Sequence, residues 1–276
     1  MRIVKIFLFT WFLCFPALVQ AQNSPNLSVE TLRLSIPSSK YVTPYRETNK
    51  NQIEKFVTIS YTSFFSSKSM SMSYQLYLPK GYTEKRKYPL IVLLHGANRT
   101  GKSVNERWQR MADEVGLVLA APTSPHPKKI WMVGNELASY ADLIEAVTNN
   151  VLNNLSIDRS RVYLFGHSNG GMFATVMPLY NPNLYAAIVV NAGKLPNGAA
   201  EQVPNMKAKV PIAFLIGTHD NIFPLQAVQN SAETFASNGH PTTLKIFNRH
   251  NHWYYTPAHE INQHALGFML QYKMSN

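Results

Sequence analysis

The stretch that decides the fold reads Val162-Tyr163-Leu164-Phe165-Gly166-His167-Ser168-Asn169-Gly170-Gly171. It opens with a short apolar run typical of a buried strand, and the apolar residues that follow it predict a helix. Between these two elements, Ser168 has one glycine two positions before it and another two positions after it. Such glycines let the backbone make a sharp strand-to-helix bend without a Cβ clash. The pattern therefore predicts an exposed Ser168 hydroxyl on a tight turn, directly before a helix N-terminus.

Further apolar runs share the character of this strand and lack the alternation of a half-exposed one. They are Leu90–Leu94, Leu117–Ala120, Ala187–Val190, Ile212–Ile216 and Leu244–Phe247. Helical patterns lie between them, and in one of these the apolar residues from Tyr140 to Leu155 mark a single face. Strands that alternate with helices predict a mostly parallel central sheet with helices on both faces. The expected fold class is α/β.

Two strand candidates precede this series, at Phe56–Tyr61 and Met72–Leu78. The second alternates between apolar and polar residues and stops before Pro79, as a half-buried strand would. Such a lead-in fits an α/β hydrolase better than a plain doubly wound domain. We expect residues 22–70 to form an N-terminal extension with the first strand region, and residues 71–276 to form one α/β-hydrolase catalytic domain.

A serine hydroxyl becomes a nucleophile only beside a base that is oriented by an acid. In this fold class the acid and then the histidine follow the serine along the chain. Asp220 is the favoured acid because it comes just after the predicted strand Ile212–Ile216. Glu201 and Glu233 follow no strand. Asp220 can also be read as a turn or helix-capping residue.

Two histidines, His250 and His252, follow the last predicted strand and are both candidates for the base. Their spacing would also suit half of a metal site, but no His-Glu-x-x-His motif or carboxylate-histidine cluster supplies further ligands. We therefore expect no metal. The remaining histidines are less well placed, and His167 and His219 are expected to pack beside the site.

Backbone N–H groups for a developing oxyanion are predicted at two positions. The strand Leu90–Leu94 runs into His95-Gly96-Ala97, where a small residue lets the N–H of Ala97 turn inward. The second donor would be the N–H of Asn169, directly after Ser168. Together with the acid and the base, these groups complete the constellation that acyl transfer requires.

The N-terminus, residues 1–21, has the order of a secretory signal peptide. Arg2 and Lys5 precede an apolar run, and Val19-Gln20-Ala21 supplies the small residues of a cleavage site. A membrane anchor is the rival interpretation, but the run is shorter than the roughly 20 residues that span a bilayer. We expect a secreted or periplasmic protein. Because Cys14 is the only cysteine, the processed chain would form no disulfide.

The formal net charge is +11, which raises the question of an anionic partner. The basic residues are scattered, however, and the densest cluster, Lys85-Arg86-Lys87, lies in a turn between strands. We expect no nucleic-acid binding and no stable membrane insertion after signal cleavage.

With these residues assembled, the chain resembles the secreted polyhydroxybutyrate depolymerase and feruloyl esterase branch of the α/β hydrolases. The likeness spans about Met72 to the C-terminus. It is carried by Pro89–Gly96, Ala112–Val118, Ile157–Tyr163 with the turn at Ser168, and Gly217–Asp220.

The resemblance implies a triad of Ser168, Asp220 and a histidine after the last strand. Related esterases place that histidine directly before aromatic residues, which favours His252 before Trp253, with His250 kept as the alternative. The chain departs from many depolymerases in its lack of further cysteines and of an appended substrate-binding domain. Both departures weaken the case for action on an insoluble polymer.

The sequence thus predicts a serine esterase that needs no cofactor and hydrolyses small-molecule or polysaccharide-linked carboxylic esters. Candidate substrate contacts are Trp131, His95 and Trp253, although the loop around Trp131 can equally be a rim that packs on the sheet. One rival is a serine peptidase of the same fold. Another is a catalytically silent, secreted carbohydrate-binding protein.

Overall fold

The computed structural model describes residues 26–32, 52–63, 66–134 and 136–275. The predicted signal peptide, residues 1–21, lies outside the described residues. In the described part the chain alternates between strands and helices after residue 88, as the apolar runs predicted.

The described strands form one nine-stranded sheet in the order β1-β9-β8-β7-β6-β4-β5-β3-β2. Neighbouring strands run parallel from β1 to β5, whereas β3 pairs antiparallel with β5 and with β2. The strands are β1 (Leu27–Leu32), β2 (Gln52–Ser63), β3 (Ser66–Tyr77), β4 (Tyr88–Leu94), β5 (Val118–Pro122), β6 (Ile157–His167), β7 (Ala187–Asn191), β8 (Ile212–Gly217) and β9 (Thr242–Phe247). This mostly parallel sheet confirms the predicted fold class.

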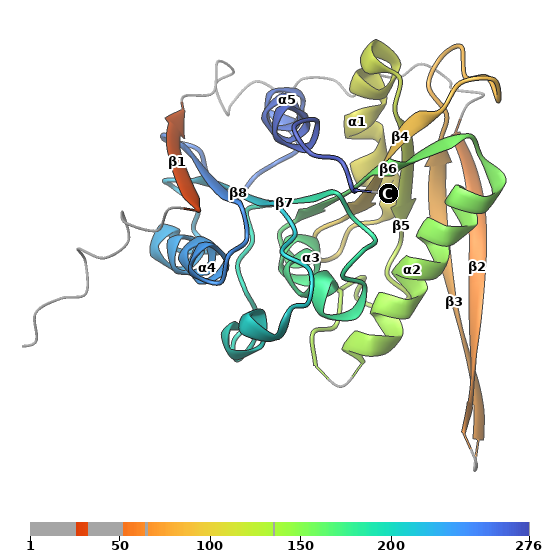
Figure 1. The fold of residues 1–276 in the computed structure, drawn as a ribbon, viewed down its shortest axis with the longest axis horizontal. Coiled ribbons are helices and arrows are strands. Elements are labelled where there is room, and N and C mark those ends of the chain that lie inside the picture. Colours follow the sequence, from red (N-terminus) through yellow and green to blue (C-terminus); the bar gives the residue numbers. More distant parts are fainter. Residues whose placement is uncertain (1–25, 33–51, 64–65, 135, 276) are drawn as a thin grey trace, which may run out of the picture.

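Helices cover both faces of the sheet (Figure 1). In the view of Figure 1, α1 and α5 lie above the sheet, and α2, α3 and α4 lie below it. The helices are α1 (Gly101–Val115), α2 (Leu137–Asn154), α3 (Asn169–Tyr180), α4 (Leu225–Ser237) and α5 (Ala258–Met269), with a short 3₁₀ helix η1 (Ala200–Asn205).

Each face of the sheet has its own hydrophobic core. Along β4, Leu90 and Val92 belong to the core beneath α2, α3 and α4, whereas Ile91 and Leu93 belong to the core beneath α1 and α5. Successive side chains of a strand point to opposite faces, so a strand with helices on both sides must be apolar throughout. This explains why the central strands appear in the sequence as continuous apolar runs.

The segments before β4 also join the sheet. β1 pairs in parallel with β9 at the far edge, so that Val29 lies opposite Leu244. β3 places Leu76 opposite Ala120 of β5. The described parts of residues 22–70 thus contribute strands to both edges of the sheet, and the proposed domain boundary at residue 70 falls within β3.

Parallel strands bring their carboxyl ends to one edge of the sheet, where ligands and catalytic groups gather in folds of this kind. The segments that follow β4, β6, β8 and β9 therefore meet at this edge. They contain every predicted site residue except Trp131, which follows β5 at the same edge.

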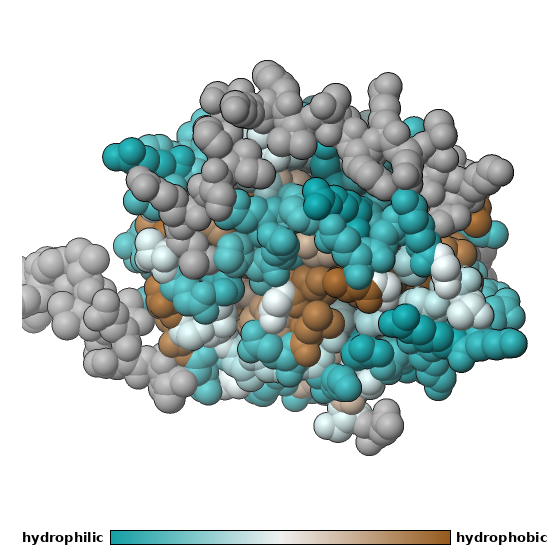
Figure 2. All heavy atoms as spheres, turned by 90° about the horizontal axis from the view of Figure 1, so that it is seen from above, coloured by the Kyte–Doolittle hydropathy of each residue, from teal (hydrophilic) through white to brown (hydrophobic). Residues whose placement is uncertain are grey.

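Among the described residues, no helix combines the length and the apolar character needed to cross a bilayer. Figure 2 shows that the described surface seen from above is mostly hydrophilic, with one group of hydrophobic residues near its middle and others towards its left and right edges.

Candidate active site

Ser168 stands at the bend between β6 and α3. Its backbone has φ 55° and ψ −120°, a left-handed conformation that is strained for any residue but glycine. The bend is possible because of its neighbours. A Cβ on Gly166 would lie 2.3 Å from the carbonyl oxygen of Gly170, and one on Gly170 would lie 2.5 Å from that of Leu94. Both positions therefore require glycine, as the motif predicted.

Three side chains from separate loops meet at this bend. The Nε2 of His252 lies 2.9 Å from the Oγ of Ser168, and its Nδ1 lies 2.8 Å from the Oδ2 of Asp220. Asp220 follows β8 and His252 follows β9, so the order of strands in the sheet places the two residues side by side. The His252 side chain is 20% exposed, whereas the Asp220 side chain is fully buried. The imidazole thus bridges a buried carboxylate and a hydroxyl.

The Asp220 carboxylate is held by more than His252. Its Oδ1 accepts hydrogen bonds from the backbone N–H groups of Ile222 (2.9 Å) and Phe223 (2.8 Å). Burial acts to raise the pKa of Asp220, but the hydrogen bonds from His252 and from these two N–H groups outweigh it and hold the pKa below its ordinary value. Asp220 therefore stays ionised at neutral pH with its orientation fixed.

His250, the alternative base, occupies a different place. It is buried, and its ring lies edge-on to Phe247 at 6.2 Å. Its backbone carbonyl accepts a hydrogen bond from the N–H of His219. Burial lowers the pKa of His250 to about 4. Among the described residues it is His252, and not His250, that lies within hydrogen-bonding distance of Ser168.

The segments that carry the two predicted oxyanion donors both lie next to Ser168. A Cβ on Gly96 would lie 3.3 Å from the Cβ of Ser168, so the segment after β4 runs directly past the hydroxyl-bearing carbon. Neither the N–H of Ala97 nor that of Asn169 has an acceptor among the described residues. Asn169 also begins α3, where the helix dipole favours negative charge.

His95 and Trp131, predicted as substrate contacts, are almost fully buried. The indole N–H of Trp131 donates to the carbonyl of His95 at 2.8 Å. The Asn169 side chain bonds both the N–H (2.6 Å) and the carbonyl (3.1 Å) of Trp131. Both aromatic rings lie beneath the surface, which favours the alternative that the loop around Trp131 packs on the sheet, and their direct contact with substrate stays a prediction. They tie the loop after β5 to the two segments that carry the N–H donors.

The ring of His95 has a fixed protonation state. Its Nε2 accepts from the N–H of Ser124 at 3.0 Å, so its proton resides on Nδ1, which donates to the carbonyl of Gly96 at 2.7 Å. A second proton on Nε2 would face another N–H group. Burial lowers the pKa of His95 to about 4, despite the opposing hydrogen bond to Gly96.

This lowered pKa predicts a loss of stability in acid. An unfolded histidine binds a proton near pH 6.5, whereas folded His95 stays neutral until about pH 4. The stabilisation that neutral His95 contributes is fully present above pH 6.5 and is lost as the pH falls towards 4. In that interval His95 gains a proton only in the unfolded chain. Urea unfolding should show a decline of up to about 1.4 kcal/mol per pH unit from this residue.

The His95→Gln variant should have a flatter dependence of unfolding free energy on pH than the wild type. His219→Gln is the matched control, since it removes an exposed histidine. Equal slopes for wild type and His95→Gln between pH 6.5 and 4 would contradict the prediction.

Two residues that the sequence did not single out support the site. Asn191, at the end of β7, accepts the N–H of Ser168 through its carbonyl at 2.9 Å and donates through its side chain to the Nδ1 of His167 at 3.0 Å. Phe223 packs against the His252 ring with a centroid separation of 5.6 Å. Neither residue belongs to a recognisable motif. Trp253, which is 44% exposed, stays a predicted substrate contact.

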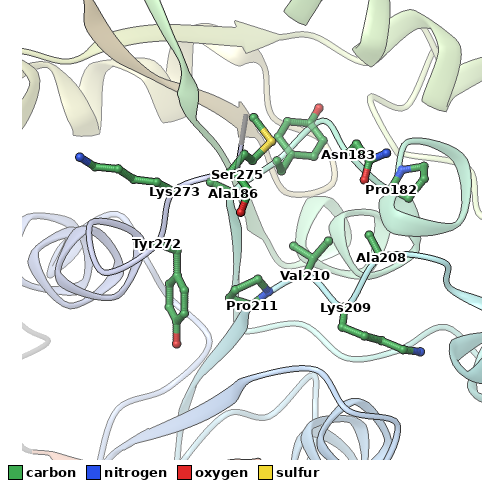
Figure 3. Close-up of a pocket in the computed structure, with 12 residues that line it drawn as sticks. Pro182, Asn183, Ala186, Ala208, Lys209, Val210, Pro211, Tyr272, Lys273 and Ser275 are labelled. Carbon is green, nitrogen blue, oxygen red and sulfur yellow. The ribbon is translucent and has the colours of Figure 1, made fainter.

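A pocket of about 380 Å³ lies at the opposite edge of the sheet (Figure 3). Ala186 and Pro211, which line it, directly precede β7 and β8, whereas the site residues follow the strands. Figure 3 shows the side chains of Lys209 and Lys273 extending away from each other. None of the predicted site residues lines this pocket. Within the described residues, no group of three or more His, Cys, Asp or Glu side chains is placed to hold a metal ion.

The sheet order, the strained serine bend and the facing histidine and aspartate define the class of an α/β hydrolase. More specifically, the chain belongs to the Phospholipase/Carboxylesterase family, whose sequence pattern matches residues 122–269, more than half of its length.

Individual relatives agree with the resemblance predicted from the sequence. The chain is 27% identical to a poly(3-hydroxybutyrate) depolymerase of Ralstonia pickettii over 158 residues, covering 50% of this chain and 31% of that protein. It is 33% identical to feruloyl esterase B of Neurospora crassa over 113 residues, covering 38% of each chain. The chain thus spans less than half the length of these curated relatives.

Solved structures agree in fold. A thermostable esterase superposes with a TM-score of 0.61 at 21% identity, covering 79% of this chain and 63% of the other. An acetyl xylan esterase from Aspergillus awamori superposes with a TM-score of 0.60 at 16% identity, covering 71% of this chain and 94% of the other. At these identities the likeness establishes the fold alone.

Proposed function

We propose that this protein is a serine esterase that hydrolyses carboxylic esters through an acyl-enzyme. The observation that supports this proposal best is the chain of two hydrogen bonds from Ser168 through His252 to Asp220, at 2.9 and 2.8 Å. Family membership supports carboxylesterase chemistry in general, and the roles of the individual residues are part of the proposal.

In the first half of the reaction, the Oγ of Ser168 attacks the ester carbonyl while the Nε2 of His252 takes the hydroxyl proton. Asp220 keeps the other proton of the imidazole on Nδ1 and stabilises the imidazolium that forms. The negative charge that develops on the carbonyl oxygen is received by the N–H groups of Ala97 and Asn169. When the tetrahedral intermediate collapses, the C–O bond breaks and His252 gives its proton to the departing alcohol.

In the second half, water takes the place of the alcohol. His252 removes a proton from the water as the water oxygen attacks the acyl carbon. The bond between the acyl carbon and the Oγ of Ser168 then breaks, and the Oγ regains a proton from His252. The products are the free carboxylic acid and the original enzyme. This cycle is complete without a cofactor, and none is part of the proposal.

The proposed substrates are small-molecule or polysaccharide-linked esters. This scope rests on the relatives, which are named as a poly(3-hydroxybutyrate) depolymerase, a feruloyl esterase and a bifunctional acetylxylan esterase/xylanase. We further propose that the protein is secreted or periplasmic. The support for this is the charged and then apolar pattern of residues 1–21, which lies outside the described residues.

Labelling with a fluorophosphonate probe tests the proposal. We expect the wild type to take up one equivalent of probe, because the activated Ser168 attacks phosphorus as it would a carbonyl. The Ser168→Ala variant should take up none while keeping the wild-type circular dichroism spectrum. A carbohydrate-binding protein with a silent site would take up no probe in either form. Cleavage of peptide substrates at rates above those of p-nitrophenyl esters would instead favour the peptidase alternative.

A further inference from the structure

An arginine that has no carboxylate partner within the described part of the chain borders the proposed active site. Arg99 is exposed, and its guanidinium carbon lies 5.2 Å from the ring centroid of Trp253 and 5.2 Å from that of Tyr255. The two rings contact each other at 5.2 Å and are inclined by 55°. Such cation–π contacts hold a guanidinium by its flat faces. The N–H groups along its edge are then left for another partner.

The positive charge of the cluster formed by Arg99, Trp253 and Tyr255 is not neutralised by any of the residues that the structure describes. No carboxylate among the described residues lies within ion-pair distance of Arg99. A second cation, Arg107, lies 5.7 Å from the ring of Tyr255, and its buried Nε has no acceptor among the described residues. The carboxylate of Asp220, in the proposed active site, is fully buried and already bonded to His252. An anion placed beside Arg99 would therefore meet uncompensated positive charge.

The backbone fixes where this cluster lies relative to the reacting atoms. The N–H of Arg99 donates to the carbonyl of Gly96 at 3.2 Å, and Gly96 lies against Ser168. At the other end, Trp253 directly follows His252. In the proposed reaction His252 protonates the departing alcohol, so this alcohol must lie beside its Nε2. The cluster is therefore joined through the backbone both to the segment beside Ser168 and to the residue that would protonate the alcohol.

Resting on the proposed esterase function, we propose that Arg99, held by Trp253 and Tyr255, binds a carboxylate on the alcohol part of the substrate. The substrate class is then an ester of a hydroxy acid or of an acidic sugar. The planar guanidinium suits this task, because two of its N–H groups can bind both oxygens of one carboxylate.

Matched pairs of esters test this specificity. Charge on the alcohol side is varied with 3-acetoxybenzoate and its neutral counterpart 3-acetoxybenzamide. Charge on the acyl side is varied with monophenyl adipate and phenyl adipamate. For each pair, the ratio of kcat/KM for the anionic ester to that for the neutral ester is measured. The ratio cancels any general loss of activity caused by a substitution.

In the wild type we expect the alcohol-side pair to favour the anionic ester, and Arg99→Gln should lower its ratio about tenfold, as the loss of an exposed charge-assisted hydrogen bond predicts. The acyl-side ratio should change less than twofold. Lys102→Gln, which removes one exposed charge from the first turn of α1, is the matched control and should keep the wild-type ratios.

An unchanged alcohol-side ratio in Arg99→Gln, or a fall confined to the acyl-side pair, would overturn this inference while leaving the esterase proposal standing. Failure of the folded wild type to hydrolyse any of the four esters would overturn both. Should Arg99→Gln not fold, inhibition of the wild type decides the matter. The product 3-hydroxybenzoate should inhibit at a concentration about tenfold lower than 3-hydroxybenzamide, and equal inhibition would contradict the inference.

Discussion

The His252→Gln variant is expected to lose roughly 10⁴-fold or more in kcat/KM for a p-nitrophenyl ester. Glutamine can fill much of the same space, but its amide cannot take the proton of Ser168. Without a base the hydroxyl stays protonated at neutral pH and is a weak nucleophile. Residual turnover would come from the N–H groups of Ala97 and Asn169, which the substitution leaves in place. Steady-state kinetics with both proteins at equal concentration of folded enzyme measure the effect.

His250→Gln is the matched control for this experiment. The two histidines are separated by one residue, and both follow β9, yet only His252 contacts Ser168. The His250 ring packs edge-on against Phe247 and makes no hydrogen bond to the serine. We expect this variant to lose less than tenfold in kcat/KM. A larger loss for His250→Gln than for His252→Gln would exchange the two assignments.

The residues alone did not distinguish His250 from His252 as the base. The strand Leu244–Phe247 was predictable because a continuous apolar run is typical of a strand buried on both faces. Beyond Phe247 the chain leaves the strand through Arg249, which has φ 58°, so the alternation of strand side chains no longer applies. Outside the strand, the side chains of residues two positions apart do not have to point in the same direction. Only the resemblance to related esterases favoured His252.

The elbow at Ser168 was the most predictable part of the site, because its glycines are a local requirement of the bend. The burial of Trp131 was not predictable in the same way. It depends on the side chain of Asn169, which bonds both backbone groups of Trp131 across a long interval of sequence. The pairing of β1 with β9 also depends on segments far apart in the sequence, since residues near position 29 pair with residues near position 244. Neither local propensity nor hydrophobic period encodes such long-range contacts.

The Asp220→Asn variant is expected to lose roughly 10⁴-fold in kcat, about as much as the corresponding change costs a serine protease. The reason lies in the other bonds of the carboxylate. Its Oδ1 accepts from the N–H groups of Ile222 and Phe223, and the asparagine carbonyl oxygen can keep both of these bonds. The asparagine NH₂ group must then face the Nδ1 of His252. Because two donors cannot bond to each other, the imidazole moves its proton to Nε2.

With its proton on Nε2, His252 presents a donor to Ser168 and can no longer take the hydroxyl proton. The variant should thus keep a wild-type melting temperature within a few degrees and bind substrate with similar KM, while kcat and the rate of fluorophosphonate labelling fall together. Asp220→Ala is a useful comparison, because it leaves the two N–H groups without their acceptor and should also lower stability, by about 1–3 kcal/mol. If Asp220→Asn kept more than a tenth of the wild-type kcat, Asp220 would not be controlling the tautomer of His252. The acid would then have to be sought elsewhere in the chain.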